Sequence, residues 1–158
     1  KRAESCIRER IGKRWGYRDH LWAYWPYGGH PCQTWKQTWH VESMIAQYIK
    51  LGEGWNVLVY YGVYEEDFVE VEDALKQLGC SKRDVRRSLK VLTKENTGFT
   101  FSNSEYRMSI ICIGPSSDVS QFVNTAIHEA KHVQSHVCSY YNIPEDGEDA
   151  AYLMGYLV

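Results

Sequence analysis

Residues 98–141 read GFTFSNSEYRMSIICIGPSSDVSQFVNTAIHEAKHVQSHVCSYY, and this stretch decides how the domain is built. Two apolar segments, near 98–101 and 106–113, flank the polar sequence SNSE, a pattern typical of a β-hairpin. The sequence PSSD then supplies residues that begin helices, and a long helix is predicted over about 118–141. A hairpin followed at once by an amphipathic helix indicates a small sheet packed on that helix.

The predicted helix contains an HExxH motif, His128-Glu129-Ala130-Lys131-His132. Residues i and i+4 lie one turn apart on one helix face, so the two imidazoles can converge on one zinc ion. The glutamate then lies beside the metal, where it can take a proton from a metal-activated water. The motif therefore predicts Zn²⁺ as cofactor, His128 and His132 as ligands and Glu129 as general base. Two surface histidines on a solvated face are the alternative.

An apolar stripe accompanies the motif. At about 100° per residue, the two histidines fall roughly opposite the centre of this stripe, which would anchor the helix to a sheet. The stripe consists of Val119, Phe122, Ala126, Ala130, Val133 and Val137.

A third metal ligand is expected from the residues that follow the helix. The sequence GEDAAYLMGYLV predicts an apolar helix from residue 148 to the end, with Glu148 in its first turn. A return over the Pro-Glu-Asp-Gly turn would bring Glu148 to the metal, and three protein ligands plus a water form an open, catalytic zinc site. Glu145, in the turn, and His136, two turns beyond His128, are the rival ligands. We favour Glu148 because it lies on a rigid helix.

The HExxH motif and the sequence from Glu148 to Tyr152 resemble the zincin metallopeptidases, in the gluzincin arrangement where a later glutamate completes the site. The chain from about residue 55 also resembles small zincin-like proteins of bacterial and phage genomes. The resemblance implies an α+β fold of the minimal zincin type, with a mixed sheet packed on the active-site helix. The sequence departs from the thermolysin pattern at Tyr152, because that pattern has an aspartate at this position.

In that family the strand before the active-site helix forms the upper rim of the cleft and pairs with extended substrate. The resemblance therefore implies a substrate-binding edge formed by Ser109, Ile110, Ile111, Cys112 and Ile113. A peptide or protein would be the substrate, and Tyr152 and His136 are candidate donors to the oxyanion of the transition state. The expected function is that of a zinc metallopeptidase. The alternative is a non-catalytic assembly or interaction module of a phage or mobile element.

Residues 1–43 differ in composition from the rest of the chain. They hold five of the six tryptophans and carry a net charge of +4, whereas residues 44–158 carry −6. An irregular extension is favoured over a nucleic-acid surface on which bases stack, or a metal clip of His30 and Cys32. A further alternative is that Met44 is the true start and the preceding segment is not native.

Between these regions the pattern is regular. A buried strand is expected at 55–63 after an apolar segment that begins at Met44, and two helices are expected around Gly79, the second capped by Ser81 with Asp84. The helix pair and its basic cluster at 82–87 have the look of a DNA-binding helix-turn-helix. Because the preceding helix is acidic, an ordinary helical hairpin is favoured and nucleic acid is not the expected partner.

The remaining composition bounds the class of protein. Apolar residues make up 44% of the 158 residues, and no apolar run approaches the roughly 20 residues of a membrane span. No secretion signal is recognisable, and five cysteines without a CxxC pair favour a reducing compartment, so a cytoplasmic protein without a membrane partner is expected. The chain stops inside an apolar helix with no capping residue, which predicts a truncated C-terminus.

Overall fold

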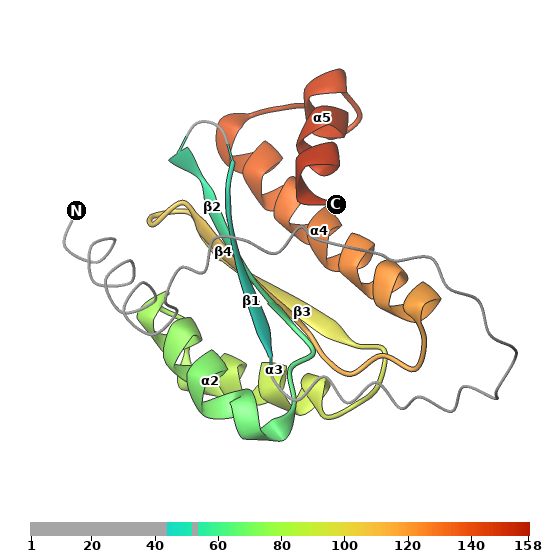
Figure 1. Cartoon of the computed structure of the whole chain (residues 1–158). Helices are drawn as coiled ribbons and strands as arrows, with labels where there is room; N and C mark the ends of the chain where they lie inside the picture. Colours follow the sequence, from blue (N-terminus) through green and yellow to red (C-terminus); the bar gives the residue numbers. More distant parts are fainter. Residues whose placement is uncertain (1–43, 52–53) are drawn as a thin grey trace, which may run out of the picture. The chain divides into compact units, whose positions relative to one another are not determined.

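The β-branched and aromatic segments form a sheet in the computed structural model, which describes residues 44–51 and 54–158 (Figure 1). The strands are β1 (Ile45–Lys50), β2 (Asn56–Tyr61), β3 (Gly98–Asn103) and β4 (Met108–Ile113). The helices are η2 (Glu65–Asp67), α2 (Phe68–Gln77), α3 (Lys82–Leu92), α4 (Val119–Tyr141) and α5 (Glu148–Leu157). The predictions for residues 1–43, including the metal clip of His30 and Cys32, lie outside the described residues.

The strands form one mixed sheet in the order β1-β2-β4-β3. The two central strands, β2 and β4, run parallel, with Val57 opposite Ser109 and Tyr61 opposite Ile113. The outer strands β1 and β3 are each antiparallel to their neighbours. The α+β class and the small mixed sheet packed on the motif-bearing helix are therefore confirmed.

The predicted substrate-binding edge is wrong. Each of its residues (Ser109, Ile110, Ile111, Cys112 and Ile113) lies opposite a residue of β2 on one side and of β3 on the other. Since both sides of β4 are paired and all six of its side chains are buried, this strand cannot add an extended peptide. Within the described part of the chain, the strand beside α4 with one unpaired side is β3.

Helix α4 covers one face of the sheet (Figure 1). The core on this face joins the helix to the two central strands and to Trp55, and its buried members are Leu51, Trp55, Val57, Val59, Ile111, Ile113, Val133 and Val137. Most of the expected apolar stripe therefore packs as predicted. Val119 is the exception, because 78% of its surface is exposed at the first turn of the helix.

The start of α4 follows from its sequence. The side chain of Asp118 accepts a hydrogen bond from the backbone N–H of Gln121 at 2.9 Å, which satisfies a donor that the first turn leaves unpaired. At the other end, Asn142 adopts the left-handed conformation with φ of 55° and ends the helix. The cap positions the HExxH motif in the middle of a 23-residue helix, where the backbone is regular.

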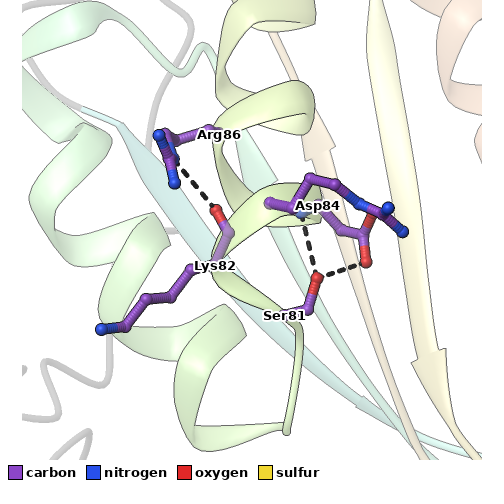
Figure 2. A network of polar contacts seen from close by, with 5 residues as sticks. Ser81, Lys82, Asp84 and Arg86 are labelled. Carbon is purple, nitrogen blue, oxygen red and sulfur yellow. Dashed lines mark hydrogen bonds and ion pairs between the residues drawn. The ribbon is translucent and has the colours of Figure 1, made fainter.

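Helices α2 and α3 form the predicted helical hairpin and lie on the other side of the sheet from α4 (Figure 1). Asn103 of β3 donates a hydrogen bond to the carbonyl of Leu78 in the turn between them. Figure 2 shows the expected cap of α3, in which the Ser81 hydroxyl accepts from the N–H of Asp84 and donates to its carboxylate. The Arg86 side chain folds back to the carbonyl of Lys82 in the same turn.

Helix α5 packs beside the C-terminal half of α4. Ala150, which is fully buried, is its contact residue, and its backbone carbonyl accepts a hydrogen bond from the side chain of Gln134. Leu153 and Leu157 add partly buried apolar surface to the core. No helix among residues 44–51 and 54–158 is long and apolar enough to cross a membrane.

Two buried groups of the sheet predict how stability responds to alkaline pH. Burial raises the pKa of the Cys112 thiol well above its usual value, and the Glu129 carboxylate raises it further. Burial also raises the pKa of the Tyr60 hydroxyl. Both groups therefore hold their protons in the folded chain at a pH at which the unfolded chain loses them, so alkaline pH favours unfolding.

We expect the free energy of unfolding to fall as pH rises above about 8.5, the pKa of an unperturbed thiol. Each group that ionises only in the unfolded chain contributes a slope of about 1.4 kcal/mol per pH unit. Urea denaturation between pH 7 and 10 measures this slope, and Cys112→Ala is expected to reduce it. An equally steep decline in that variant would contradict the assignment to Cys112.

Candidate metal centre

The two histidines of the HExxH motif converge on one point. Their Nε2 atoms are 3.2 Å apart and their rings meet edge to face, with centroids 4.8 Å apart. Two Zn–N bonds of about 2.0–2.1 Å at a tetrahedral angle separate two nitrogens by about 3.3–3.4 Å. The spacing of His128 and His132 therefore fits one tetrahedral ion, and both side chains are exposed on α4, where an ion can reach them.

Glu129 joins the pair from the buried side of the helix. Its carboxylate and the imidazole nitrogens all lie within 4.8 Å of one another, and these three residues are the one such group of possible ligands found among the described residues. Only 4% of Glu129 is exposed. The Thr100 hydroxyl on β3 lies 2.8 Å from Glu129 Oε2 and 3.0 Å from the Glu129 carbonyl oxygen, so it can donate to either. Glu129 therefore lies next to the histidine pair, as the HExxH motif predicts.

The buried place of Glu129 exists because Gly98 has no side chain. A Cβ built on Gly98 would lie 2.8 Å from Glu129 Cγ and 2.9 Å from the carbonyl oxygen of Cys112. Both contacts are closer than atoms in folded proteins tolerate, and Thr125 Cγ2 at 3.1 Å closes the third side. Gly98 therefore provides the space that the Glu129 side chain occupies beside β3.

Strand β3 presents alternate residues to α4. Gly98, Thr100 and Ser102 share the face that contacts the helix, since successive side chains of a strand point to opposite faces. The hydrogen bond from the N–H of Gly114 to the carbonyl of Thr97 fixes which backbone groups of β3 face β4. By the alternation of an antiparallel ladder, the backbone groups of the same three residues point to the outer edge.

The structure does not bring Glu148, the predicted third ligand, into the group that His128, His132 and Glu129 form. Helix α5 contacts α4 at Gln134, two residues after His132 and therefore about 200° around the helix axis. On α5 itself, Glu148 lies about 160° from the buried Ala150, and its side chain is exposed. Both rotations place this carboxylate away from the imidazoles.

The rival ligands also lie outside the group. Glu145 accepts a hydrogen bond from Ser135 at 3.0 Å and forms an ion pair with Lys131 at 3.5 Å, which ties the turn to α4. Tyr152, the first candidate oxyanion donor, is 68% exposed on α5. The carboxylates and the tyrosine that follow α4 therefore serve its packing or face solvent.

His136, the second candidate donor and a rival ligand, lies one turn beyond His132 and faces β3. Its Nδ1 is 2.8 Å from the Ser102 hydroxyl. Burial lowers the pKa of His136, and the neighbouring His132 lowers it further. The neutral imidazole is thus favoured at a position next to the metal-ligand pair but outside it.

The sequence analysis missed the residues of β3 that hold this site. Gly98, Thr100 and Ser102 belong to no motif, and their role appears only once the strand is placed beside α4. A signal was present in the alternation of Phe99 and Phe101 with small and polar residues, which indicates a strand with one polar face. The partners of that polar face are set by tertiary packing, which this pattern does not specify.

The basic cluster of α3 is exposed. Lys82, Arg83, Arg86 and Arg87 all face solvent, and Arg83 forms an ion pair with Asp84 at 3.7 Å in the same turn. Both helices of the expected hairpin are present, and the expectation that nucleic acid is not the partner stays a prediction.

Three residues of α4 and two of the neighbouring strand, Gly98 and Thr100, thus define the candidate centre. His128 and His132 offer two nitrogens, and Glu129 offers a carboxylate held by Thr100. Comparison of the chain with models of protein families, with curated proteins and with solved structures finds no match.

Proposed function

We propose that the chain is a zinc-dependent metallopeptidase in which His128 and His132 hold the metal and Glu129 is the general base. The observation that carries the proposal is the 3.2 Å separation of the two Nε2 atoms with a buried carboxylate beside them. When bound, zinc polarises a carbonyl group and makes a water molecule acidic enough to lose a proton near neutral pH.

Glu129 supports the role of proton acceptor better than that of a third ligand. Its carboxylate reaches the site from the buried side of α4, and the Thr100 hydroxyl lies 2.8 Å from Oε2, where it can donate a hydrogen bond to the carboxylate. A carboxylate held in this way keeps one orientation while it takes a proton from water and passes it to the leaving amine. Oε1, the oxygen other than the one that lies 2.8 Å from the Thr100 hydroxyl, is the oxygen we assign to this transfer.

The substrate class we propose is an extended peptide. The outward backbone groups of Gly98, Thr100 and Ser102 lie on the strand that contacts Glu129 and His136. A peptide that adds to this edge gains main-chain hydrogen bonds with little dependence on its own sequence. We therefore transfer the substrate-binding role from β4 to β3. The odd number of cysteines favours a reducing compartment such as the cytoplasm for this activity.

One observation favours a second function, a non-catalytic interaction module. Catalytic zinc sites usually have three protein ligands, and the described residues supply two imidazoles while Glu148 faces solvent. A metal held by two imidazoles binds more weakly than one held by three protein ligands. In an interaction module, the same edge strand would bind a peptide without hydrolysing it. Metal content and hydrolysis together separate the two functions.

The test is the zinc content of dialysed protein and its hydrolysis of a mixture of unstructured peptides. We expect about one zinc per chain, since one His pair forms one site. His132→Ala is expected to lose both the metal and the hydrolysis, because it removes one of the two nitrogens.

Glu148→Ala is the matched control, since it removes an exposed carboxylate from the neighbouring helix. It is expected to keep the metal and the hydrolysis. Loss of zinc from Glu148→Ala would show that the terminal helix does reach the metal. Zinc binding by the parental protein with no hydrolysis of any peptide would favour the interaction module.

A further inference from the structure

A chain of four side chains runs from the core to the surface beside the candidate centre. The indole Nε1 of Trp55 donates to Ser109 Oγ at 3.0 Å, and Ser109 Oγ lies 2.7 Å from Ser102 Oγ. Ser102 Oγ in turn lies 2.8 Å from Nδ1 of His136. Trp55 and Ser109 are buried, Ser102 is half-buried and His136 is exposed, so the chain connects the interior to solvent.

The direction of the hydrogen bonds follows from the chemistry of the groups. The indole N–H of Trp55 can only donate, so Ser109 Oγ accepts from it. Ser109 is fully buried, and its own hydroxyl proton has Ser102 Oγ as its acceptor. Ser102 then has one proton left, and the acceptor within reach is the Nδ1 atom of His136. A buried hydroxyl left without an acceptor would cost free energy, which favours this order over its reverse.

We propose that this chain fixes His136 as a neutral imidazole with its proton on Nε2, and that this N–H donates to the carbonyl oxygen of a peptide bound along β3. The inference rests on the proposed function, because it names how the same site holds its substrate. Ser102 and Ser109 are positioning residues that act through the ring, and His136 is the group that touches the substrate.

The placement of His136 suits this role. It follows His132 by four residues and so lies on the same side of α4, one turn further along. It is also hydrogen-bonded to Ser102, whose backbone groups point to the outer edge of β3. A peptide that pairs with this edge passes beside the ring. A preoriented donor at that point stabilises the negative charge that develops on a carbonyl oxygen during hydrolysis.

The first test needs neither metal nor activity. Nitrogen-15 NMR of the imidazoles in metal-free protein at pH 8 reports which ring nitrogen carries the proton. We expect His136 to be in the Nε2–H form. In Ser102→Ala the ratio of the Nε2–H form to the Nδ1–H form of His136 is expected to fall by roughly threefold to tenfold, the factor that corresponds to one hydrogen bond. Ser102→Thr keeps a hydroxyl and is expected to restore the parental ratio.

A His136 ring with its proton on Nδ1 in the parental protein would overturn the inference, and so would an unchanged ratio in Ser102→Ala. Neither outcome bears on the metal or on Glu129, so the proposed function would stand. Conversely, failure to bind zinc would end the proposed function, while the proton would still be found on Nε2.

The second test measures the donor itself. His136→Phe is expected to lower kcat by about 10²–10³, as removal of one oxyanion donor does in other hydrolases, with KM little changed. His136→Gln retains an N–H donor and is expected to recover part of that loss. Equal rates in the phenylalanine and glutamine variants would assign His136 a packing role and contradict the proposal.

Discussion

Glu129→Gln is expected to lower kcat for peptide hydrolysis by about 10²–10⁴ while the protein keeps its zinc. The amide has nearly the shape of the carboxylate but cannot accept a proton from water. Its carbonyl oxygen can still accept the hydrogen bond that Thr100 donates at 2.8 Å, so the side chain is expected to keep its buried place. Kinetics on the zinc-loaded variant, together with its metal content, measure the effect.

The metal content of Glu129→Gln separates two roles. A variant that retains zinc and hydrolyses at the parental rate would contradict the assignment of Glu129 as general base. A variant that loses its zinc would instead make Glu129 the third ligand of the His128–His132 pair. His128→Ala is the matched comparison, since it removes a proposed ligand from the same face of α4 and is expected to lose the metal.

Gly98→Ala is expected to destabilise the protein by about 1–3 kcal/mol, the usual cost of overpacking, and to displace Glu129. The added methyl group would meet Glu129 Cγ at 2.8 Å and the Cys112 carbonyl oxygen at 2.9 Å. The oxygen belongs to the central strand and cannot move freely, so the glutamate must yield. Urea denaturation measures the loss of stability, and kcat on the zinc-loaded variant reports the displaced carboxylate.

Gly155→Ala is the control for this substitution. Gly155 lies in α5, and a Cβ there meets nothing within 4 Å. Alanine is the better helix former, so this variant is expected to be unchanged or more stable by up to about 1 kcal/mol. Gly98→Ala with parental stability and kcat would show that the glutamate does not depend on the space beside β3.

Much of the fold follows from local sequence patterns. Each of three elements is predicted by its own residues, and all three are present. They are β2 with its β-branched residues, α4 with Asp118 at its start, and α3 with its Ser81 cap. Strand β1 was not identified as a strand. Its side chains are mostly exposed, so the segment lacks the alternation of a half-buried strand.

The candidate site was predictable only within α4. The i, i+4 spacing alone brings His128 and His132 together, because helix geometry is local. Glu148 lies outside this group because its position depends on how α5 packs, and the contact between Gln134 and Ala150 turns its side chain away from the histidines. The prediction that β4 forms the substrate-binding edge was wrong because the order of the strands depends on which pairs form across the sheet. Ser109 is therefore buried and belongs to a chain of hydrogen bonds.

The parallel pairing of β2 with β4 also sets the order in which the chain can fold. Asn56 lies opposite Met108, so the inner side of β2 waits for a partner made some fifty residues later. Helices α2 and α3 and strand β3 are all synthesised in that interval. A nascent chain that ends before residue 108 therefore exposes an apolar strand with an open edge, the kind of surface on which chaperones act and from which aggregates grow.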